Sequence, residues 1–237
     1  MGYSVNDIAL AGSRKITQLD FVAHNLANAA TPGFKSEHLY YAIKNDQAQK
    51  TNGNSLGPMS AAIDFSQGTL QKTGKELDLA IEGDGFFAIE TKTGTAYSRN
   101  GSFVLNKKNE LVTSTGDYVL GESGHIVVNG NSVQVAGDGT VSVNGNIAGK
   151  VKIVAFENPG NLTRAAEGRY IADETAGLKK LDNYRVAGGY LEMSNVNAVK
   201  EMIEMMDIQR NFETYQKIIT TMADFDKIST NKIGKLT

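Results

Sequence analysis

The C-terminal segment, residues 191–237, carries the strongest pattern in the sequence. Large apolar side chains recur there at alternating intervals of three and four residues, which is the spacing of a coiled-coil seam. They are Met205, Ile208, Phe212, Tyr215, Ile219 and Met222. No Gly or Pro interrupts the chain between Val196 and Lys232, and Ser194, Asn195 or Asn197 could cap a helix start. The sequence therefore predicts a long C-terminal helix with one apolar face.

A second apolar stripe widens this face at the start of the helix. Val199, Ile203 and Met206 form the stripe, with Met202 beside them. An apolar face of this breadth is unfavourable in water and calls for a packing partner. Methionines also suit an adaptable peptide groove, but the seam around them favours packing in a core or a polymer.

A packing partner is present at the other end of the chain. The same three-and-four spacing gives Val5, Ile8, Leu19 and Val22. Gly12 interrupts this helix and costs roughly 1 kcal/mol relative to Ala, so the first helix is expected to be the weaker one. We predict that the two terminal helices pair as a coiled-coil-like stem. The alternative is that both helices pack separately on the globular core of the chain.

Composition limits the classes of function. The chain has 237 residues, of which 41% are hydrophobic and 21% charged, as expected for an ordered protein. A net charge of -2 provides no basic field for nucleic acid. There is no Cys and the 3 His are isolated, so neither a metal site nor any other cofactor site is expected. No apolar run is long enough for membrane insertion, and residues 1–7 lack the pattern of a cleaved signal peptide.

Between the two helices the hydrophobic period changes from helical to two. Short apolar alternations, such as residues 77–82, are separated by Asn-Gly and Gly-Asp-Gly turns, which is typical of antiparallel strands. Asn100-Gly101 and Asn144-Gly145 are both predicted to close hairpins. The chain is therefore expected to be α+β, with a central, mainly antiparallel all-β domain of sandwich or barrel type.

The predicted organisation has four parts. Residues 1–35 form the N-terminal stem helix and a turn, and residues 36–76 form an extended linker with short β pieces. Residues 77–190 form the all-β domain, and residues 191–237 form the C-terminal stem helix. In the first part, Pro32 disfavours a helical Thr31 and Gly33 can adopt a positive φ, so the helix should end near Ala30.

Three motifs resemble the signatures of bacterial flagellar axial proteins, which are the rod, hook and hook-junction subunits. The first comprises Asn25, Leu26, Ala27 and Asn28, followed by Thr31, Pro32, Gly33, Phe34 and Lys35. The second comprises residues 78–87 and the run Tyr97, Ser98, Arg99, Asn100, Gly101, Ser102 and Phe103. The third includes Leu191, Glu192, Ser194, Asn195, Val196 and Asn197. The motifs follow the family's order and span nearly the whole chain.

The resemblance implies a structural subunit of the flagellar basal-body rod, without catalysis. Such a subunit polymerises with copies of itself and with other axial proteins through its terminal helices, and forms a tube. The signature residues would serve this assembly. The resemblance also implies delivery to the periplasmic space by the flagellar type III export apparatus, without a cleaved signal peptide. The absence of a longer insertion after the first signature favours the proximal-rod type, with the distal-rod type as the alternative.

A function of another class is a periplasmic protein whose β domain binds or cleaves cell wall. Separately, Asp78, Glu82 and Asp84 are the carboxylates that a catalytic site could use, and Asp78 and Glu82 share one face of a predicted strand. At roughly 3.3 Å per residue they lie about 13 Å apart, which is beyond the separations that glycosidases use. A solvated strand face is the better interpretation of this pair.

Overall fold

The computed structural model describes residues 5–41, 59–130, 132–179, 181 and 184–233, and these residues form an α+β fold. The helices are α1 (Val5–Ala27) and α2 (Ala198–Ile233), with short 3-10 turns η1 (Pro159–Asn161), η2 (Ala166–Gly168) and η3 (Glu174–Ala176). The strands are β1 (Glu37–Tyr41), β2 (Met59–Ile63), β3 (Leu70–Lys72), β4 (Leu79–Glu82), β5 (Phe86–Thr91), β6 (Gly94–Ser98), β7 (Phe103–Leu105), β8 (Leu111–Thr113), β9 (Tyr118–Gly121), β10 (Gly124–His125), β11 (Val133–Val135), β12 (Thr140–Val143), β13 (Asn146–Lys150), β14 (Ile153–Phe156), β15 (Leu162–Arg164), β16 (Arg169–Ala172), β17 (Leu178–Lys179), β18 (Arg185–Gly188) and β19 (Tyr190–Glu192).

The chain divides into two compact units. The helical unit comprises the described parts of residues 1–27, 37–61 and 197–237, and the β unit comprises residues 28–36 and 62–196. Residues 42–58 of the predicted linker lie outside the described residues. The described parts of that linker contain β1, β2 and β3.

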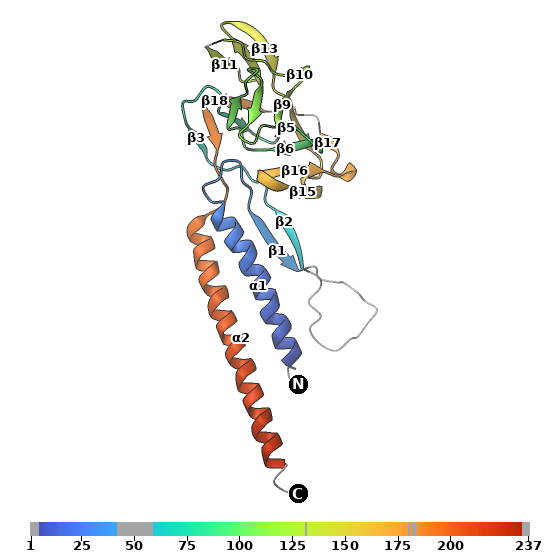
Figure 1. Cartoon of the computed structure of the whole chain (residues 1–237), viewed down its shortest axis with the longest axis vertical. Helices are drawn as coiled ribbons and strands as arrows, with labels where there is room; N and C mark the ends of the chain where they lie inside the picture. Colours follow the sequence, from blue (N-terminus) through green and yellow to red (C-terminus); the bar gives the residue numbers. More distant parts are fainter. Residues whose placement is uncertain (1–4, 42–58, 131, 180, 182–183, 234–237) are drawn as a thin grey trace. The chain divides into compact units, whose positions relative to one another are not determined.

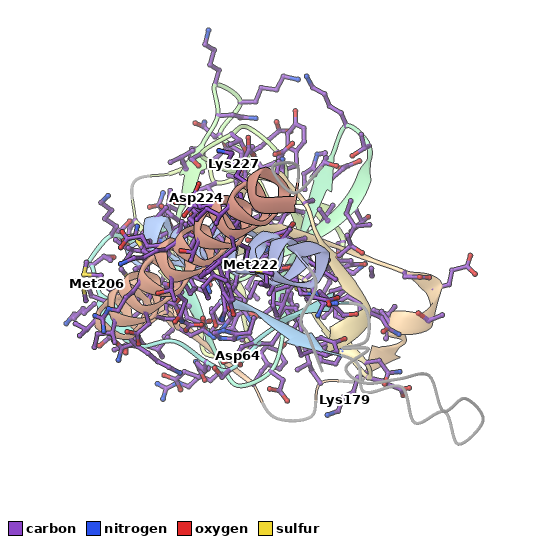
Figure 2. All side chains as sticks on the ribbon, turned by 90° about the horizontal axis from the view of Figure 1, so that it is seen from below. Asp64, Lys179, Met206, Met222, Asp224 and Lys227 are labelled. Carbon is purple, nitrogen blue, oxygen red and sulfur yellow. The ribbon has the colours of Figure 1, made fainter. Side chains whose placement is uncertain are left out.

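In the helical unit, α1 and α2 pack side by side in antiparallel directions, and α2 continues past the start of α1 (Figure 1). Most predicted seam positions are half-buried, and Val22 and Ile208 are fully buried. The side chain of Val5, which begins α1, lies outside the described residues. The second stripe of α2 is exposed instead, as the position of Met206 in Figure 2 illustrates. Neither described α-helix is long and apolar enough to cross a membrane.

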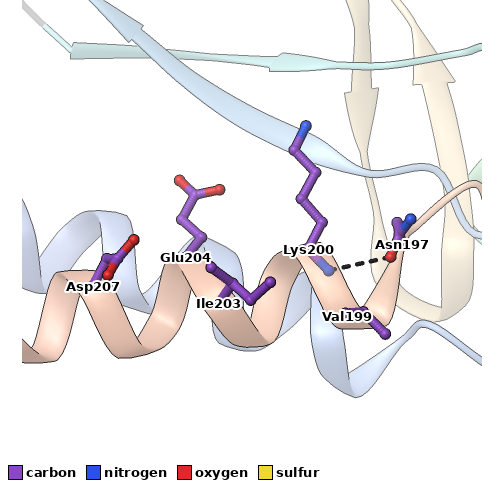
Figure 3. A pocket seen from close by; sticks show the side chains of 6 residues that line it. All are labelled: Asn197, Val199, Lys200, Ile203, Glu204 and Asp207. Carbon is purple, nitrogen blue, oxygen red and sulfur yellow. Dashed lines mark hydrogen bonds between the residues drawn. The ribbon is translucent and has the colours of Figure 1, made fainter.

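Local hydrogen bonds explain where the two helices begin and end. The first helix ends at Ala27, three residues before the predicted Ala30. Asn28 accounts for the difference, because its backbone oxygen accepts from the amide of Thr31 (3.1 Å) and its side-chain oxygen accepts from the Thr31 hydroxyl (3.2 Å). Of the three candidate caps, Asn197 caps α2, since its side-chain oxygen accepts from the amide of Lys200 at 3.1 Å (Figure 3).

The β unit is built on a ten-stranded sheet whose main path runs β15-β16-β6-β5-β9-β8-β7, with β10, β14 and β17 attached beside it. A three-stranded sheet, β11-β12-β13, and the pairs β18-β4 and β19-β3 complete the unit. All strand pairs whose register is described are antiparallel. Two clusters fill the interior, a mainly aliphatic one that includes Val119 and Phe87, and a mainly aromatic one around Phe86 and Tyr170.

One of the two predicted Asn-Gly hairpins is confirmed and the other is wrong. Asn144 and Gly145 have φ of 51° and 84° and join β12 to β13. Asn100 and Gly101 join strands that pair elsewhere, since β6 pairs with β5 and β16 while β7 pairs with β8. A Cβ on Gly101 would lie 1.7 Å from the Leu79 carbonyl oxygen. This glycine therefore permits a close approach of two backbones and does not form a tight turn.

The prediction of a solvated face at Asp78 is also wrong. Asp78 is buried, while Glu82 is half-buried. The reason is that the segment is covered by neighbours on both sides. Leu79 in β4 is hydrogen-bonded to Gly101, and the amide of Gly189 donates to the Asp78 carbonyl oxygen at 2.7 Å.

Candidate functional site

The three sequence signatures meet inside the β unit around the carboxylate of Glu192. Glu192 ends β19, and its side chain is completely buried. One carboxylate oxygen, Oε1, lies 2.6 Å from Nζ of Lys35, and the other, Oε2, lies 3.3 Å from Nη1 of Arg99. Lys35, Arg99 and Glu192 belong to the first, second and third signature respectively. We call these three residues the signature triad.

Backbone groups add further hydrogen bonds to the signature triad. The amide of Gly68 donates to Glu192 Oε1 at 2.9 Å, and Lys35 Nζ donates to the carbonyl oxygen of Ser66 at 2.6 Å. Arg99 Nη1 donates to the Gly83 carbonyl oxygen at 2.9 Å. Buried ion pairs need such additional bonds to offset the loss of water, so the site is built as a closed ionic junction.

Burial governs the electrostatics of the two cations. It lowers the pKa of Lys35, and the attraction of Glu192 offsets only part of this effect. Burial lowers the pKa of Arg99 in the same way. In addition, the Arg99 guanidinium lies over the ring of Phe86, 5.1 Å from its centre, and its Nε is buried without a hydrogen-bond partner in the part of the chain that the structure describes.

The turn of the first signature is fitted against the other two signatures. Gly33 has a φ of +70°, and its amide donates to the carbonyl oxygen of Glu192 at 2.7 Å. A Cβ at this position would lie 2.2 Å from the backbone nitrogen of Asn100. Gly33 is therefore required both by its backbone conformation and by space.

Asn195 fastens the third signature to the backbone that follows the first. Its side-chain oxygen accepts from the amide of Ser36 at 2.7 Å, and its side-chain nitrogen donates to the Asp64 carbonyl oxygen at 2.8 Å. Phe34 is buried beside these contacts, with the Arg164 guanidinium 4.5 Å from the centre of its ring. Arg164 also donates from Nη2 to the Lys35 carbonyl oxygen at 2.5 Å.

The remaining signature residues take local roles. Asn25 and Glu37 exchange two hydrogen bonds of 3.0 Å, which tie the start of β1 to the end of α1 within the helical unit. Ser194 accepts from the amide of Val196 at 3.2 Å. Leu191 is buried, Leu26, Pro32 and Val196 are half-buried, and Ala27 is exposed. The seam residues all belong to the helical unit and lie outside the signature triad.

Sequence reasoning missed two of the three triad residues. Lys35 and Arg99 stood inside the recognised motifs but were not singled out as site residues. The available signal was the positive charge within each motif, since Lys35 follows Phe34 and Arg99 precedes Asn100-Gly101. Among the described residues, no group of three or more His, Asp or Glu side chains is placed to hold a metal ion.

Two family models match parts of the chain. The model described as the flagellar hook protein FlgE/F/G D1 domain matches residues 80–143, and the model described as the flagellar basal body rod FlgEFG protein C-terminal region matches residues 187–232. These matches include most of the sheet core and the segment from β18 to α2.

Full-length relatives extend the similarity to almost the whole chain. The flagellar basal-body rod protein FlgF of Caulobacter vibrioides is 31% identical over 98% of this chain and 99% of its own length. The rod protein FlgG of Bacillus subtilis is 35% identical over 86% of this chain and 89% of its own length. FlgG of Borreliella burgdorferi is 34% identical over 90% and 92% respectively.

Proposed function

This chain belongs to the family of flagellar basal-body rod proteins, and we propose that it works as a structural subunit through which the bacterial flagellar rod polymerises. The single observation that carries this assignment is the end-to-end similarity to a rod protein, at 31% identity over 98% of the chain. The closed signature triad agrees with a structural role, since its charged groups are paired with one another and with backbone atoms.

The helical unit is the polymerising part in this proposal. On α2, the less exposed apolar positions follow the three-and-four spacing of a coiled-coil seam, and they face α1 in the helical unit. Fully burying one large apolar side chain contributes roughly 1.5–3 kcal/mol. Because the second stripe remains exposed in the single chain, other copies have apolar surface to cover. Segments 1–35 and 191–237 would thus form a coiled-coil-like stem, with 77–190 as the outer domain and 36–76 connecting them.

The signature triad would fix the roots of this stem. Residues 28–36 follow α1 and residues 189–196 precede α2, and the two segments are fastened to each other inside the β unit through Gly33, Lys35, Glu192 and Asn195. The segment that follows α1 and the segment that precedes α2 are therefore held together within the β unit. We propose that this is the function shared by the first and third signatures.

The proposed partners are copies of this chain and other flagellar rod proteins. We further propose that the flagellar type III export apparatus delivers the chain to the periplasmic space without removal of a signal peptide. This part rests on membership of the family.

Within the family, we propose the proximal-rod, FlgF-type role. The support is alignment length, since the Caulobacter FlgF is matched over 99% of its length and the Bacillus FlgG over 89%. The higher identity to the Bacillus FlgG, 35% against 31%, favours the distal-rod, FlgG-type role as the second candidate. Deleting the gene and locating the missing rod segment in the basal bodies by cryo-electron microscopy distinguishes them, because loss of only the distal segment contradicts the proximal assignment.

A charge placed in the seam tests the polymerisation proposal. Phe212→Asp or Ile219→Asp should abolish assembly and leave the β unit folded, because the charge would have to be buried between helices. Gln216→Asp, at an exposed position of the same helix, is the matched control and should assemble. The readouts are motility, recovery of the chain in purified basal bodies, and near-ultraviolet circular dichroism of the purified variants. Normal motility of both seam variants would contradict the proposal.

Hydrogen exchange tests whether the two terminal helices become fully ordered only when the subunits assemble. If assembly completes the helical unit, amides of residues 5–26 and 199–222 should exchange quickly in the dilute chain and slowly in isolated basal bodies, relative to amides of β5 and β9. Equal protection of helices and sheet in the dilute chain would show that the helical unit is already complete without other copies.

A further inference from the structure

The chain contains four Asn-Gly steps, and three of them lie in the described residues. These are Asn100-Gly101, Asn129-Gly130 and Asn144-Gly145. Asparagine is a chemically labile residue, and it is most reactive before glycine, which has no side chain to shield its backbone nitrogen. The second and third steps both stand in the tetrapeptide Val-Asn-Gly-Asn. Their local sequences predict equal reactivity, so a difference between them must come from the fold.

The reaction takes place within the residue pair. The glycine nitrogen forms a bond to the side-chain carbonyl carbon of the asparagine, and the side-chain nitrogen takes up the glycine N–H proton and leaves as ammonia. Water then opens the resulting succinimide ring at either carbonyl group and gives aspartate or isoaspartate. The nitrogen and the carbon meet only after the backbone and the side chain rotate, so local packing controls the rate.

The first step, Asn100-Gly101, is held in place inside the β unit. Gly101 is buried, and its carbonyl oxygen accepts from the amide of Leu79 at 3.0 Å. The side-chain oxygen of Asn100 accepts from the amide of Ser102, also at 3.0 Å. Bringing the Asn100 side chain to the Gly101 nitrogen would disrupt these bonds, so the fold protects this step.

The second step, Asn129-Gly130, is exposed, but side chains of the β12–β13 hairpin pack on it. A Cβ on Gly130 would lie 2.4 Å from Nδ2 of Asn144 and 2.6 Å from Cγ1 of Val143. The side-chain oxygen of Asn129 accepts from Nδ2 of Asn109 at 3.1 Å. Exposure to solvent therefore does not leave this step free to rotate.

The third step, Asn144-Gly145, has open space around it. It forms the two-residue turn between β12 and β13, in the three-stranded sheet whose β11 and β13 are labelled in Figure 1. Both residues are exposed, and nothing lies within 4 Å of a Cβ placed on Gly145. The side-chain oxygen of Asn144 accepts from the amide of Ser132 at 3.3 Å, which is long for a hydrogen bond. This step is therefore the least restrained of the three.

We infer that the fold directs spontaneous deamidation to Asn144. The product adds one negative charge to the tip of the β12–β13 hairpin. Aspartate keeps the length of the turn. Isoaspartate carries an additional methylene group in the main chain, which is too long for a two-residue turn that pairs Val143 with Asn146. The inference depends on the β unit alone and holds for either rod type.

Peptide mapping of the purified natural chain tests the inference. The folded chain is incubated in mildly alkaline buffer, and tandem mass spectrometry with electron-transfer fragmentation locates each product and distinguishes aspartate from isoaspartate. Asn144 should react roughly tenfold faster than Asn100, because Asn100 reacts only after local opening of a buried segment. Asn144 should also react faster than Asn129. Faster reaction at Asn129 or at Asn100 would overturn the inference.

Incubation of the same chain in denaturant is the control. Asn129 and Asn144 then differ only in their distant sequence, so their rates should become equal. A preference for Asn144 that persists in denaturant would show that the fold does not direct the reaction, and it would overturn the inference.

Asn144→Gly separates the packing argument from the exposure argument. This variant removes the reactive amide and the side chain that packs on Gly130, and glycine accepts the positive φ of 51° at this position. Reaction at Asn129 should become at least about twofold faster, because local opening around Gly130 is then less restrained. Circular dichroism checks that the variant is folded. An unchanged rate at Asn129 in the folded variant would show that packing on Gly130 does not protect this step, and the inference would fail.

Discussion

Replacing Glu192 by glutamine removes one negative charge from the signature triad and changes little else. Glutamine has nearly the same shape, and its carbonyl oxygen can still accept from the amide of Gly68. Lys35 and Arg99 would remain, with 0% and 3% of their side-chain surface exposed and without the carboxylate that pairs with both. Removing one partner of a buried ion pair costs roughly 3–5 kcal/mol. A typical domain has about 5–15 kcal/mol in total, so the loss would be a large part of the stability of the β unit.

The measurement is denaturant unfolding of the full chain, followed by near- and far-ultraviolet circular dichroism. Glu122→Gln is the matched control, because it makes the same chemical change at a more exposed pair, in which Glu122 lies 3.2 Å from Lys150. Exposed pairs contribute about 0–1 kcal/mol. Glu192→Gln should therefore lower the free energy of unfolding by several times the effect of Glu122→Gln.

A double-mutant cycle shows whether the effect comes from the ion pair. Lys35→Met and Glu192→Gln together should cost less than the sum of the two single substitutions, because the second change removes a charge that the first left unpaired. The reasoning is refuted if Glu192→Gln falls within 1 kcal/mol of the natural chain, or if the two substitutions are additive.

Three further predictions follow from individual side chains. Gly33→Ala should lower the melting temperature strongly because the added Cβ would clash with backbone atoms. Gly12→Ala adds a Cβ with nothing within 4 Å and should raise the free energy of unfolding by about 1 kcal/mol. Equal effects of the two substitutions on the melting temperature would contradict this. In a carbon-13 titration of the folded chain, Lys35 should lose its proton below pH 10.5 and Lys150 above it, because burial lowers the pKa of the first and a hydrogen bond raises that of the second. Between the lowered pKa and pH 10.5, Lys35 binds fewer protons in the folded chain than in the unfolded chain, so its contribution to stability rises with pH. If Lys150 lost its proton at a lower pH than Lys35, the result would contradict the description of the site. Glu201→Leu should raise the free energy of unfolding by about 1 kcal/mol, because Oε2 of this buried residue has no hydrogen-bond partner among the described residues. A lower melting temperature of the variant would argue against this.

The features that the sequence predicted well depend on neighbours within one or two turns. Periodicity between Met205 and Met222 predicts which side of α2 is less exposed, because residues three and four apart share a helix face. Asn144-Gly145 predicts a hairpin because the positive φ of such a turn is a local requirement. Continuing the same periodicity one step back reaches Glu201, which is buried although its charge suggested otherwise.

The signature triad could not be predicted in this way. Lys35 and Glu192 are 157 residues apart, and Arg99 and Glu192 are 93 apart, and no periodic pattern states which distant charges will meet. Asn100-Gly101 failed for a related reason, since its local signal is the same for a hairpin turn and for a close approach of backbones. Only the pairing of β4 with its neighbours distinguishes the two.

The position of Glu192 near the C-terminal end of the β unit sets the order in which this unit can fold. Its carboxylate neutralises Lys35 and Arg99, and β19, which ends with it, supplies the partner of β3. A growing chain that stops short of this residue contains both cations and an unpaired strand edge but not the group that closes them. Folding through such distant contacts is slow, and here its last step must wait until nearly all of the β unit, which ends at Val196, has been synthesised.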